Sequence, residues 1–251
     1  MKILLTIVTG SLLLSIHTSA QTSAFSEMVL LPKGTFTMGR NSAYPTDWQP
    51  EHEVQIDAFY LDRYEVTNQQ YSEFCKSTKH ALPIFWGMKE FHCGLDFPDH
   101  PVVGVSFFDA LQYAKWMKKR LPTEAEWEYA SRGGLSGKNF PNGDQIDSTL
   151  ANYGIKYKGS IKTGSLRANG YGLYDMAGNV WEWISDNYQA DYYKTSPEIN
   201  PKGAENGRFK VIRGGSWHSG AMCNQNYYRN GLSPSWVDFG VGFRCARDAT
   251  K

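Results

Sequence analysis

The sequence predicts one α+β domain that is rich in loops and poor in regular secondary structure. Aromatic residues make up 14% of the 251 residues, and the chain contains 24 glycines. Aromatic side chains bury large apolar surfaces and glycine is typical of irregular backbone, so this composition favours a loop-rich, aromatic-packed fold over a helical bundle. No tandem repeat, low-complexity tract or linker divides the chain. One domain is therefore the simplest organisation.

Two stretches near the amino-terminus have the pattern of β-strands. Residues 28–31 are apolar, residues 35–39 alternate, and Pro32, Lys33 and Gly34 lie between them. A Pro/Gly turn between two such stretches predicts a β-hairpin. Residues 52–60 alternate between polar and apolar side chains and predict a further, half-buried strand.

Three segments begin with the pattern of a helix capping box, in which a Ser or Thr precedes an acidic or amide side chain by three residues. Apolar residues at helical spacing follow in each segment, and two glycines end the third. These patterns predict three helices with structural roles. The pairs are Thr67 with Gln70, Ser106 with Asp109, and Thr123 with Glu126.

The rest of the chain has few regular patterns. Residues 135–168 are dominated by Gly, Asn, Asp and Lys, which predicts a long irregular segment. Bound metal is one feature that keeps such a segment ordered. Residues 209–212 and 241–245 have strand-like patterns.

The first 20 residues have the features of a secretory signal peptide. Lys2 supplies a positive charge, residues 3–14 contain a short apolar run, and Ala20 ends a stretch of small residues suited to cleavage. The apolar run is too short to span a bilayer, and no other stretch is apolar enough to do so. The prediction is a mature domain over residues 21–251 that is periplasmic or secreted.

Charged residues are nearly balanced, with 26 Lys and Arg against 25 Asp and Glu. A net charge of +1 gives no electrostatic reason to expect binding to nucleic acid or an anionic membrane. The short basic run at residues 118–120 is explained as the solvated end of a helix.

The chain has four cysteines, an even number that favours disulfides in an oxidising compartment. Four cysteines allow three pairings. Nearness along the chain favours Cys75 with Cys93 and Cys223 with Cys245.

A set of motifs occurs in order along nearly all of the mature chain. The motifs are residues 38–39, 57–60, 64–68, 100–106, 120–130, 169–183, 213–217 and 242–244. Together they resemble the formylglycine-generating enzyme, or sulfatase-modifying-factor, family. The resemblance implies a single α+β domain with a fold similar to that of C-type lectins.

The resemblance implies a calcium site between residues 175 and 182. At the matching positions the family uses the side chains of Asp175 and Glu182 and the backbone carbonyls of Gly178 and Val180. Calcium prefers six to eight oxygen ligands, and a divalent ion compensates two buried carboxylates. The alternative interpretation is that Asp175 caps a turn and Glu182 pairs with an arginine.

A second calcium site of the family matches this chain only in part. Asn152 and the carbonyl of Tyr153 stand at two of its ligand positions. Residues 154–159 contain no acid that would complete it.

The enzymes of the family oxidise a sulfatase cysteine to formylglycine with two cysteines that hold copper(I). Here the matching positions fall near Ser219 and Ala221, and Cys223 is the one cysteine nearby. Cys223 is therefore a reactive thiol or half of a disulfide. His218 either shares a copper or zinc ion with Cys223 or is a surface, hydrogen-bonding residue. Ser216 is a candidate for lining a cleft.

Three functions remain compatible with this sequence. The favoured one is an exported, calcium-stabilised binding or accessory module with an exposed aromatic patch for an unidentified protein or small molecule. The second is an oxidase of another type, since relatives of the pyoverdine-tailoring type and of the iron-dependent ergothioneine type oxidise small molecules; the latter takes part of its iron ligands from a helical domain that this chain lacks. The third is a formylglycine generator with displaced cysteines. The candidates for the patch are Tyr188, Tyr192, Tyr193 and Trp236.

Overall fold

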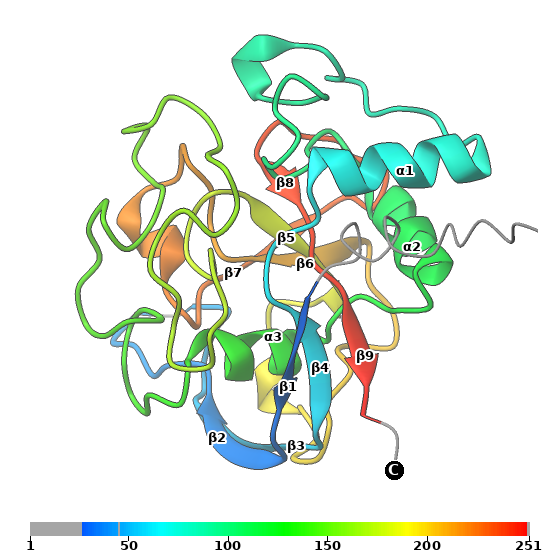
Figure 1. Cartoon of the computed structure of the whole chain (residues 1–251). Coiled ribbons are helices and arrows are strands. Elements are labelled where there is room, and N and C mark those ends of the chain that lie inside the picture. The colour runs from blue at the N-terminus through cyan, green and yellow to red at the C-terminus, as the bar shows by residue number, and fades with distance from the viewer. Residues whose placement is uncertain (1–26, 45, 250–251) are drawn as a thin grey trace, which may run out of the picture.

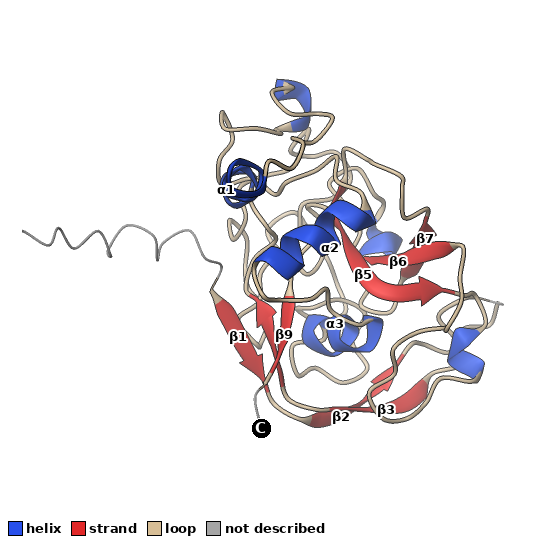
Figure 2. Cartoon of the chain, turned by 90° about the vertical axis from the view of Figure 1, so that its right-hand side faces the viewer, coloured by secondary structure: helices blue, strands red, loops and turns tan. Residues whose placement is uncertain are grey.

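The computed structural model describes residues 27–249 except residue 45, so the predicted signal peptide at residues 1–20 lies outside the described residues. Three small sheets carry the β-structure, and loops make up much of the remaining chain (Figure 1; Figure 2). Their strand orders are β1-β4-β9, β2-β3 and β7-β6-β5-β8. The predicted loop-rich α+β class is confirmed. The strands are β1 Met28–Leu31, β2 Gly34–Met38, β3 His52–Ile56, β4 Phe59–Asp62, β5 Trp181–Tyr188, β6 Phe209–Arg213, β7 Arg229–Leu232, β8 Val241–Gly242 and β9 Ala246–Asp248.

The two predicted strands at the amino-terminus form, but the predicted hairpin between them is wrong. β1 pairs antiparallel with β4, and β2 pairs antiparallel with β3. The predicted strand at 52–60 is itself divided, because β3 ends at Ile56 and β4 begins at Phe59. A two-residue hairpin needs left-handed backbone that proline cannot adopt, so the chain continues past Pro32 instead of reversing. Residues 28–38 and 52–62 therefore form one interrupted antiparallel ribbon.

The three predicted helices and their capping boxes are confirmed. In each, the Ser or Thr side chain accepts from the N3 backbone, and the N3 side chain accepts from the backbone of the capping residue. No helix among residues 27–249 is long and apolar enough to cross a membrane. The helices are α1 Asn68–Thr78, α2 Phe107–Trp116 and α3 Glu124–Ser131, with short 3₁₀ segments η1 Lys89–Phe91, η2 Tyr192–Lys194 and η3 Ala221–Asn224.

Two apolar clusters form most of the core. The first joins α3 to β2, β3, β4 and β5, and the second joins α1 and α2 to β5, β6 and β8. Every residue of α3 is buried, including its three glutamates. Ion pairs must therefore compensate the charges of this helix.

The long irregular segment is confirmed, since the described chain has no helix or named strand between α3 and β5. The strand predicted at 209–212 is β6, whereas the pattern at 241–245 yields only the two-residue strand β8. The carbonyl of Cys245 instead accepts a hydrogen bond from the backbone N–H of Asp62. The segment after β8 therefore lies against the end of β4 before β9 begins.

A buried carboxyl in β5 predicts a pH-dependent stability. Burial, reinforced by the negative charge of Glu124, raises the pKa of Asp186 to about 7 from its ordinary value of 3.8. The folded state thus holds a proton that the unfolded state has lost between these values, so this group's contribution to stability falls as the pH rises from about 4 to about 7. We expect Asp186→Asn to remove that contribution, because an amide does not titrate in this range. The amide oxygen can still accept from the Ser185 hydroxyl, as the carboxyl oxygen does at 2.9 Å. The melting temperature of the variant relative to the parent should rise between pH 4 and pH 8; a difference that is constant with pH would contradict the assignment.

Candidate functional site

Three buried carboxylates and one buried arginine lie together where β5 begins. Glu182 accepts from Arg244 at both oxygens, with Nε to Oε2 at 2.8 Å and Nη2 to Oε1 at 2.7 Å. The indole Nε1 of Trp127 also donates to Glu182, at 2.8 Å. Glu65 and Asp175 are the other two carboxylates, and both are buried. Glu182 thus has the arginine partner expected from the alternative interpretation of the sequence.

The charges of this acidic cluster, Glu65, Asp175 and Glu182, exceed that of Arg244. Burial, together with the charges of Asp175 and Glu182, raises the pKa of Glu65 well above its usual range. Burial also raises the pKa of Asp175 to about 6, although the Gly164 N–H and Arg244 oppose this shift. Both effects arise from negative charge held in a low-dielectric interior. The site therefore favours either protonation of a carboxyl or a bound cation.

The backbone of the loop before β5 is fixed by left-handed residues. Asp175 has a φ of 56°, and its Oδ2 accepts from the backbone N–H of Gly164 at 2.7 Å. Gly178 has a φ of 80°, and a Cβ there would lie 2.1 Å from the carbonyl oxygen of Asn152. Only glycine fits this close approach. Asp175, Gly178 and Val180 therefore lie on one loop of fixed conformation, and Glu182 follows this loop in β5.

Sequence analysis missed Glu65 and Arg244 as parts of this site. Glu65 comes from the segment between β4 and α1, where Asn179 Nδ2 donates to its Oε2 at 2.7 Å and the Val180 N–H donates to its Oε1 at 3.3 Å. Each residue lies within a motif that was noticed, at 64–68 and at 242–244. Both are more than 60 residues from Asp175 in sequence, so only the fold shows that the motifs converge.

Asn152 supplies an observation that bears on the second predicted calcium site. Its side chain is fully buried, and its Nδ2 donates to the carbonyl of Gly159 at 2.9 Å and to Asn179 Oδ1 at 3.2 Å. Its Oδ1 has no hydrogen-bond partner among the described residues. A buried acceptor without a donor suits a cation or a water molecule. Tyr153 follows with its hydroxyl bonded to the carbonyl of Ile146 at 3.2 Å.

Ser216, His218 and Ser219 form a compact polar cluster after β6. Ser216 Oγ lies 3.1 Å from His218 Nδ1 and 3.0 Å from Ser219 Oγ, and the Ser216 N–H donates to Ser219 Oγ at 3.1 Å. Burial lowers the pKa of His218, although Asp238 acts in the opposite direction. The His218 ring also contacts Phe239. His218 is therefore a solvent-exposed, hydrogen-bonded residue, as one of the two interpretations of the sequence expects.

The four cysteines are free thiols, so the predicted disulfides Cys75–Cys93 and Cys223–Cys245 are wrong for this structure. Their neighbours explain this result. Cys75 Sγ lies 3.5 Å from the carbonyl of Ala81, whereas Cys93 belongs to a separate apolar cluster beside Val103. Cys245 is fully buried near Asp62 and Lys119, whereas Cys223 is partly exposed and packs with Tyr228 against the second apolar cluster. Nearness along the chain was misleading in both pairs.

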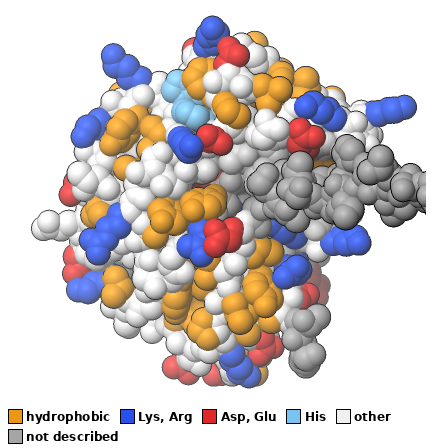
Figure 3. All heavy atoms as spheres, viewed as in Figure 1, with side chains coloured by type: hydrophobic (Ala, Val, Ile, Leu, Met, Phe, Trp, Pro, Cys, Tyr) orange, Lys and Arg blue, Asp and Glu red, His pale blue; other side chains and the backbone are white. Residues whose placement is uncertain are grey.

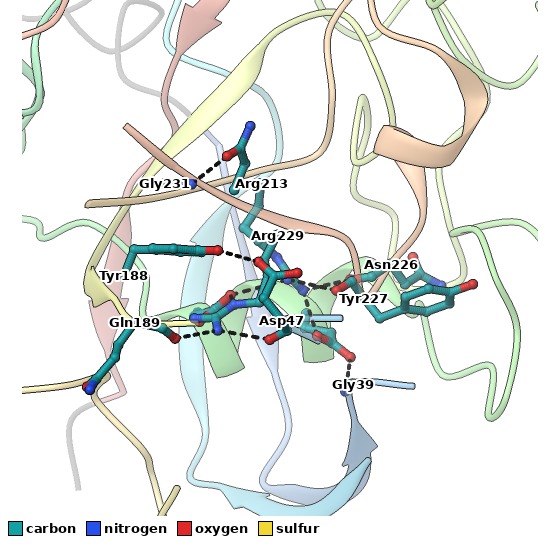
Figure 4. A network of polar contacts seen from close by, with 12 residues as sticks. Gly39, Asp47, Tyr188, Gln189, Arg213, Asn226, Tyr227, Arg229 and Gly231 are labelled. Carbon is teal, nitrogen blue, oxygen red and sulfur yellow. Dashed lines mark hydrogen bonds and ion pairs between the residues drawn. The ribbon is translucent and has the colours of Figure 1, made fainter. Parts of the chain in front are cut away.

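A buried ion network holds the segment that carries these candidate residues (Figure 4). Arg213 Nη2 donates to Glu128 at 2.6 Å and to the carbonyl of Asn226 at 2.7 Å. Arg229 donates to both oxygens of Glu124, at 2.7 Å and 2.6 Å, and reaches the carbonyls of Asp47 and Gln189. These contacts tie both ends of the 213–229 segment to α3. Ser216, His218 and Cys223 therefore lie on a loop with a fixed base.

The predicted aromatic patch is wrong in part. Tyr192 and Tyr193 are buried, and their hydroxyls have no partner among the described residues. Tyr188 is half-buried and donates to Asp47, while Trp236 is exposed. Separately, a cavity of about 860 Å³ lies between α2, the start of α3 and β9. Its lining does not include Ser216, His218 or Cys223.

The fold is that of a loop-rich α+β domain, and comparison with known proteins gives its family. A model of the sulfatase-modifying factor enzyme 1-like domain matches residues 15–249. The chain therefore belongs to the sulfatase-modifying-factor family.

Relatives of different activity share this domain. The chain is 34% identical to a formylglycine-generating enzyme of Streptomyces coelicolor, over 88% of this chain and 89% of that protein. It is 31% identical to the inactive Cα-formylglycine-generating enzyme 2 of Bos taurus, over 88% of each chain. Among solved structures, PvdO from Pseudomonas aeruginosa superposes with a TM-score of 0.78 at 30% identity, over 90% of this chain and 95% of PvdO.

Proposed function

We propose that this chain is an exported, calcium-stabilised binding or accessory module that does not make formylglycine by the two-cysteine copper route. The observation that carries the proposal is the environment of its thiols. Burial raises the pKa of Cys75 and of Cys93 to about 11, and raises that of Cys245 well above its usual range. Copper(I) needs thiolates that ionise and can be reached. Cys223, the one partly exposed cysteine, has no such partner.

The residue near the first family cysteine position supports the same proposal. Ser219 is buried and hydrogen-bonded to Ser216, so a hydroxyl engaged in a polar cluster replaces a soft thiolate ligand. A relative that is named inactive shares this domain over nearly its full length. Family membership is thus compatible with loss of the oxidase activity.

Calcium fits the residues that are present. Ligands for one ion would be carboxylate oxygens of Asp175 and Glu65 and the carbonyls of Gly178 and Val180, with Glu182 held beside them by Arg244. No three His, Cys, Asp or Glu side chains in the described part of the chain converge closely enough to hold an ion alone, so backbone carbonyls or waters are needed. A bound divalent ion supplies positive charge to the acidic cluster and orders the loop before β5. Asn152 Oδ1 and the Tyr153 carbonyl are the candidates for a second ion.

An alternative function is an oxidase of the same family, either formylglycine-generating or small-molecule-oxidising. Two observations favour it: the likeness to PvdO at 30% identity, and the polar cluster of Ser216, His218 and Ser219 beside aromatic rings. Such a site requires a redox metal, copper or iron, or another oxidant. Ser216 and His218 would then position a small substrate.

A thiol count on the calcium-loaded native protein separates these functions. We expect one thiol to react quickly with a small thiol reagent and four to react after denaturation, because three are buried. Cys223→Ser should abolish the fast reaction, and Cys93→Ser, where the thiol is buried, should leave it unchanged. Copper(I) binding should be weak, and a sulfatase peptide that contains cysteine should gain no aldehyde. Two fast thiols with tight copper(I) binding and aldehyde formation would instead establish a formylglycine generator.

A further inference from the structure

Two partly exposed histidines lie together in segments that carry none of the residues of the candidate site. His92 follows η1 and His100 precedes the segment leading to α2; their ring centroids are 5.0 Å apart and the ring planes meet at 77°. Ser160 contacts both. Its carbonyl oxygen lies 2.6 Å from His92 Nδ1, and its Oγ lies 3.3 Å from His100 Nδ1. Histidine side chains are seen side by side on the surface in the upper part of Figure 3.

These contacts determine which ring nitrogens are available. A carbonyl oxygen only accepts, so His92 Nδ1 carries the proton and Nε2 keeps its lone pair in the neutral ring. The Ser160 hydroxyl can accept from His100 Nδ1 in the same way, and His100 Nε2 then keeps its lone pair in the neutral ring. Neither Nε2 has a hydrogen-bond partner within residues 27–249, and neither is among the buried atoms that lack one, so both reach solvent. Imidazoles with Nδ1 held and Nε2 free are typical of metal ligands.

The backbone around the two rings is held by buried contacts. Asn68 at the start of α1 donates from its Nδ2 to the carbonyls of His92 and Phe97, both at 2.9 Å. The backbone N–H of Asn68 donates to the carbonyl of His100 at 2.9 Å. A Cβ at Gly159 would lie 2.8 Å from His92 Nδ1, so glycine lets this ring seat against the chain. The two imidazoles are therefore preorganised on one buried asparagine and one serine.

We propose that His92 and His100 form a surface site for a divalent transition metal that prefers imidazole, with Cu²⁺ binding more tightly than Zn²⁺. Nitrogen ligands favour these ions over calcium, and the Irving–Williams order places copper above zinc. Asp99 is already paired with Lys162 at 2.8 Å and is not taken as a ligand. No third His, Cys, Asp or Glu joins the pair in the described part of the chain. The ion would keep open positions for water or for a ligand from a partner.

The test uses calcium-saturated, untagged protein carrying Cys223→Ser, so that the partly exposed thiol does not compete for metal. Cu²⁺ and then Zn²⁺ are titrated by calorimetry, and the copper complex is examined by electron paramagnetic resonance. We expect one copper per chain with two coordinated nitrogens, and at least about tenfold weaker binding in His92→Gln or His100→Gln. The matched control is His80→Gln. The half-buried ring of His80 pairs with Asp109, so its substitution should leave copper binding unchanged. Equal copper affinity in the parent and in the variant with both substitutions overturns the proposal.

Ser160→Ala tests the positioning role separately, because it removes the contact to His100 and leaves the carbonyl contact to His92. We expect copper binding to weaken by up to about tenfold while the complex keeps its stoichiometry. A measurement that needs no variant covers the case in which a substitution prevents folding. Zn²⁺ should protect both rings from carbethoxylation, read by peptide mass spectrometry, and leave His80 unprotected. Modification of His92 and His100 that is unaffected by Zn²⁺ counts against the site.

Discussion

Arg213→Met is expected to lower the free energy of unfolding by about 3–5 kcal/mol, as is typical when one partner of a buried ion pair is removed. Arg213 is fully buried, and its guanidinium lies between Glu124 and Glu128 at 3.3 Å and 2.6 Å. Burial alone would raise the pKa of Glu128, but the charges of Arg132 and Arg213 bring it below its ordinary value. The variant would leave negative charge in α3 without full compensation.

The loss would extend beyond the ion pair. Arg213 also donates to the carbonyls of Tyr227 and Asn226, at 3.2 Å and 2.7 Å, and these acceptors would have no donor in the variant. Both carbonyls belong to the loop that carries His218 and Cys223. We therefore expect faster reaction of the Cys223 thiol as well as lower stability. Arg213→Lys should be intermediate, since it keeps the charge but not the forked geometry.

Thermal unfolding in saturating calcium measures this prediction. A loss of that size corresponds to a decrease in melting temperature of roughly 6–20 °C for a domain of this length. The matched control is Lys138→Met, which removes an exposed pair with Asp144 at 2.7 Å and should change stability by less than about 1 kcal/mol. Equal melting temperatures for the two variants would mean that the network contributes little.

Local elements of this fold could be predicted because their causes are local. Each of the three capping boxes needs only a pair of side chains three residues apart, and each one begins a helix where the sequence places it. Strand pairing is different. Residues 28–31 and 35–38 were correctly identified as strands, but their partners lie some 20 or 30 residues further on. Proline at position 32 excludes the short hairpin, and this signal was available in the sequence.

Only those residues of the candidate site that lie in one segment of the sequence could be predicted to lie together. Asp175 and Glu182 are seven residues apart and share a motif, whereas Glu65 reaches them only through the fold. The arginine partner of Glu182 was expected as an alternative, but its identity as Arg244 depends on how the segment after β8 runs beside β4. The cysteine pairing failed for the same reason, because distance along the chain is a weak guide to distance in an irregular fold.

Removal of calcium is expected to lower the melting temperature of the parent protein. An ion that binds only the folded state stabilises it by roughly 2.7 kcal/mol at one hundred times its dissociation constant. In this structure the ion would compensate Glu65 and Asp175, whose pKa values are raised by burial among like charges. Without the ion, one of these groups must take up a proton or remain charged and uncompensated. We therefore expect a chelator to lower the melting temperature. Mg²⁺ should restore little of the lost melting temperature, because it demands a smaller, more regular ligand shell than calcium.

Asp175→Ala is the informative variant, because Asp175 forms no direct ion pair with an arginine among residues 27–249, although the charge of Arg244 acts on it. Glu182 binds Arg244 and Trp127 directly, so its replacement would damage the fold with or without an ion. We expect Asp175→Ala to melt at nearly the same temperature in calcium and in chelator, whereas Asp144→Ala, an exposed acid, should respond as the parent does.

Native mass spectrometry of Asn152→Ala adds the stoichiometry: one ion fewer than the parent assigns the unpartnered Oδ1 to a second calcium. A parent whose melting is insensitive to chelator, with no calcium bound, would instead mean that a proton on Glu65 or Asp175 balances the acidic cluster.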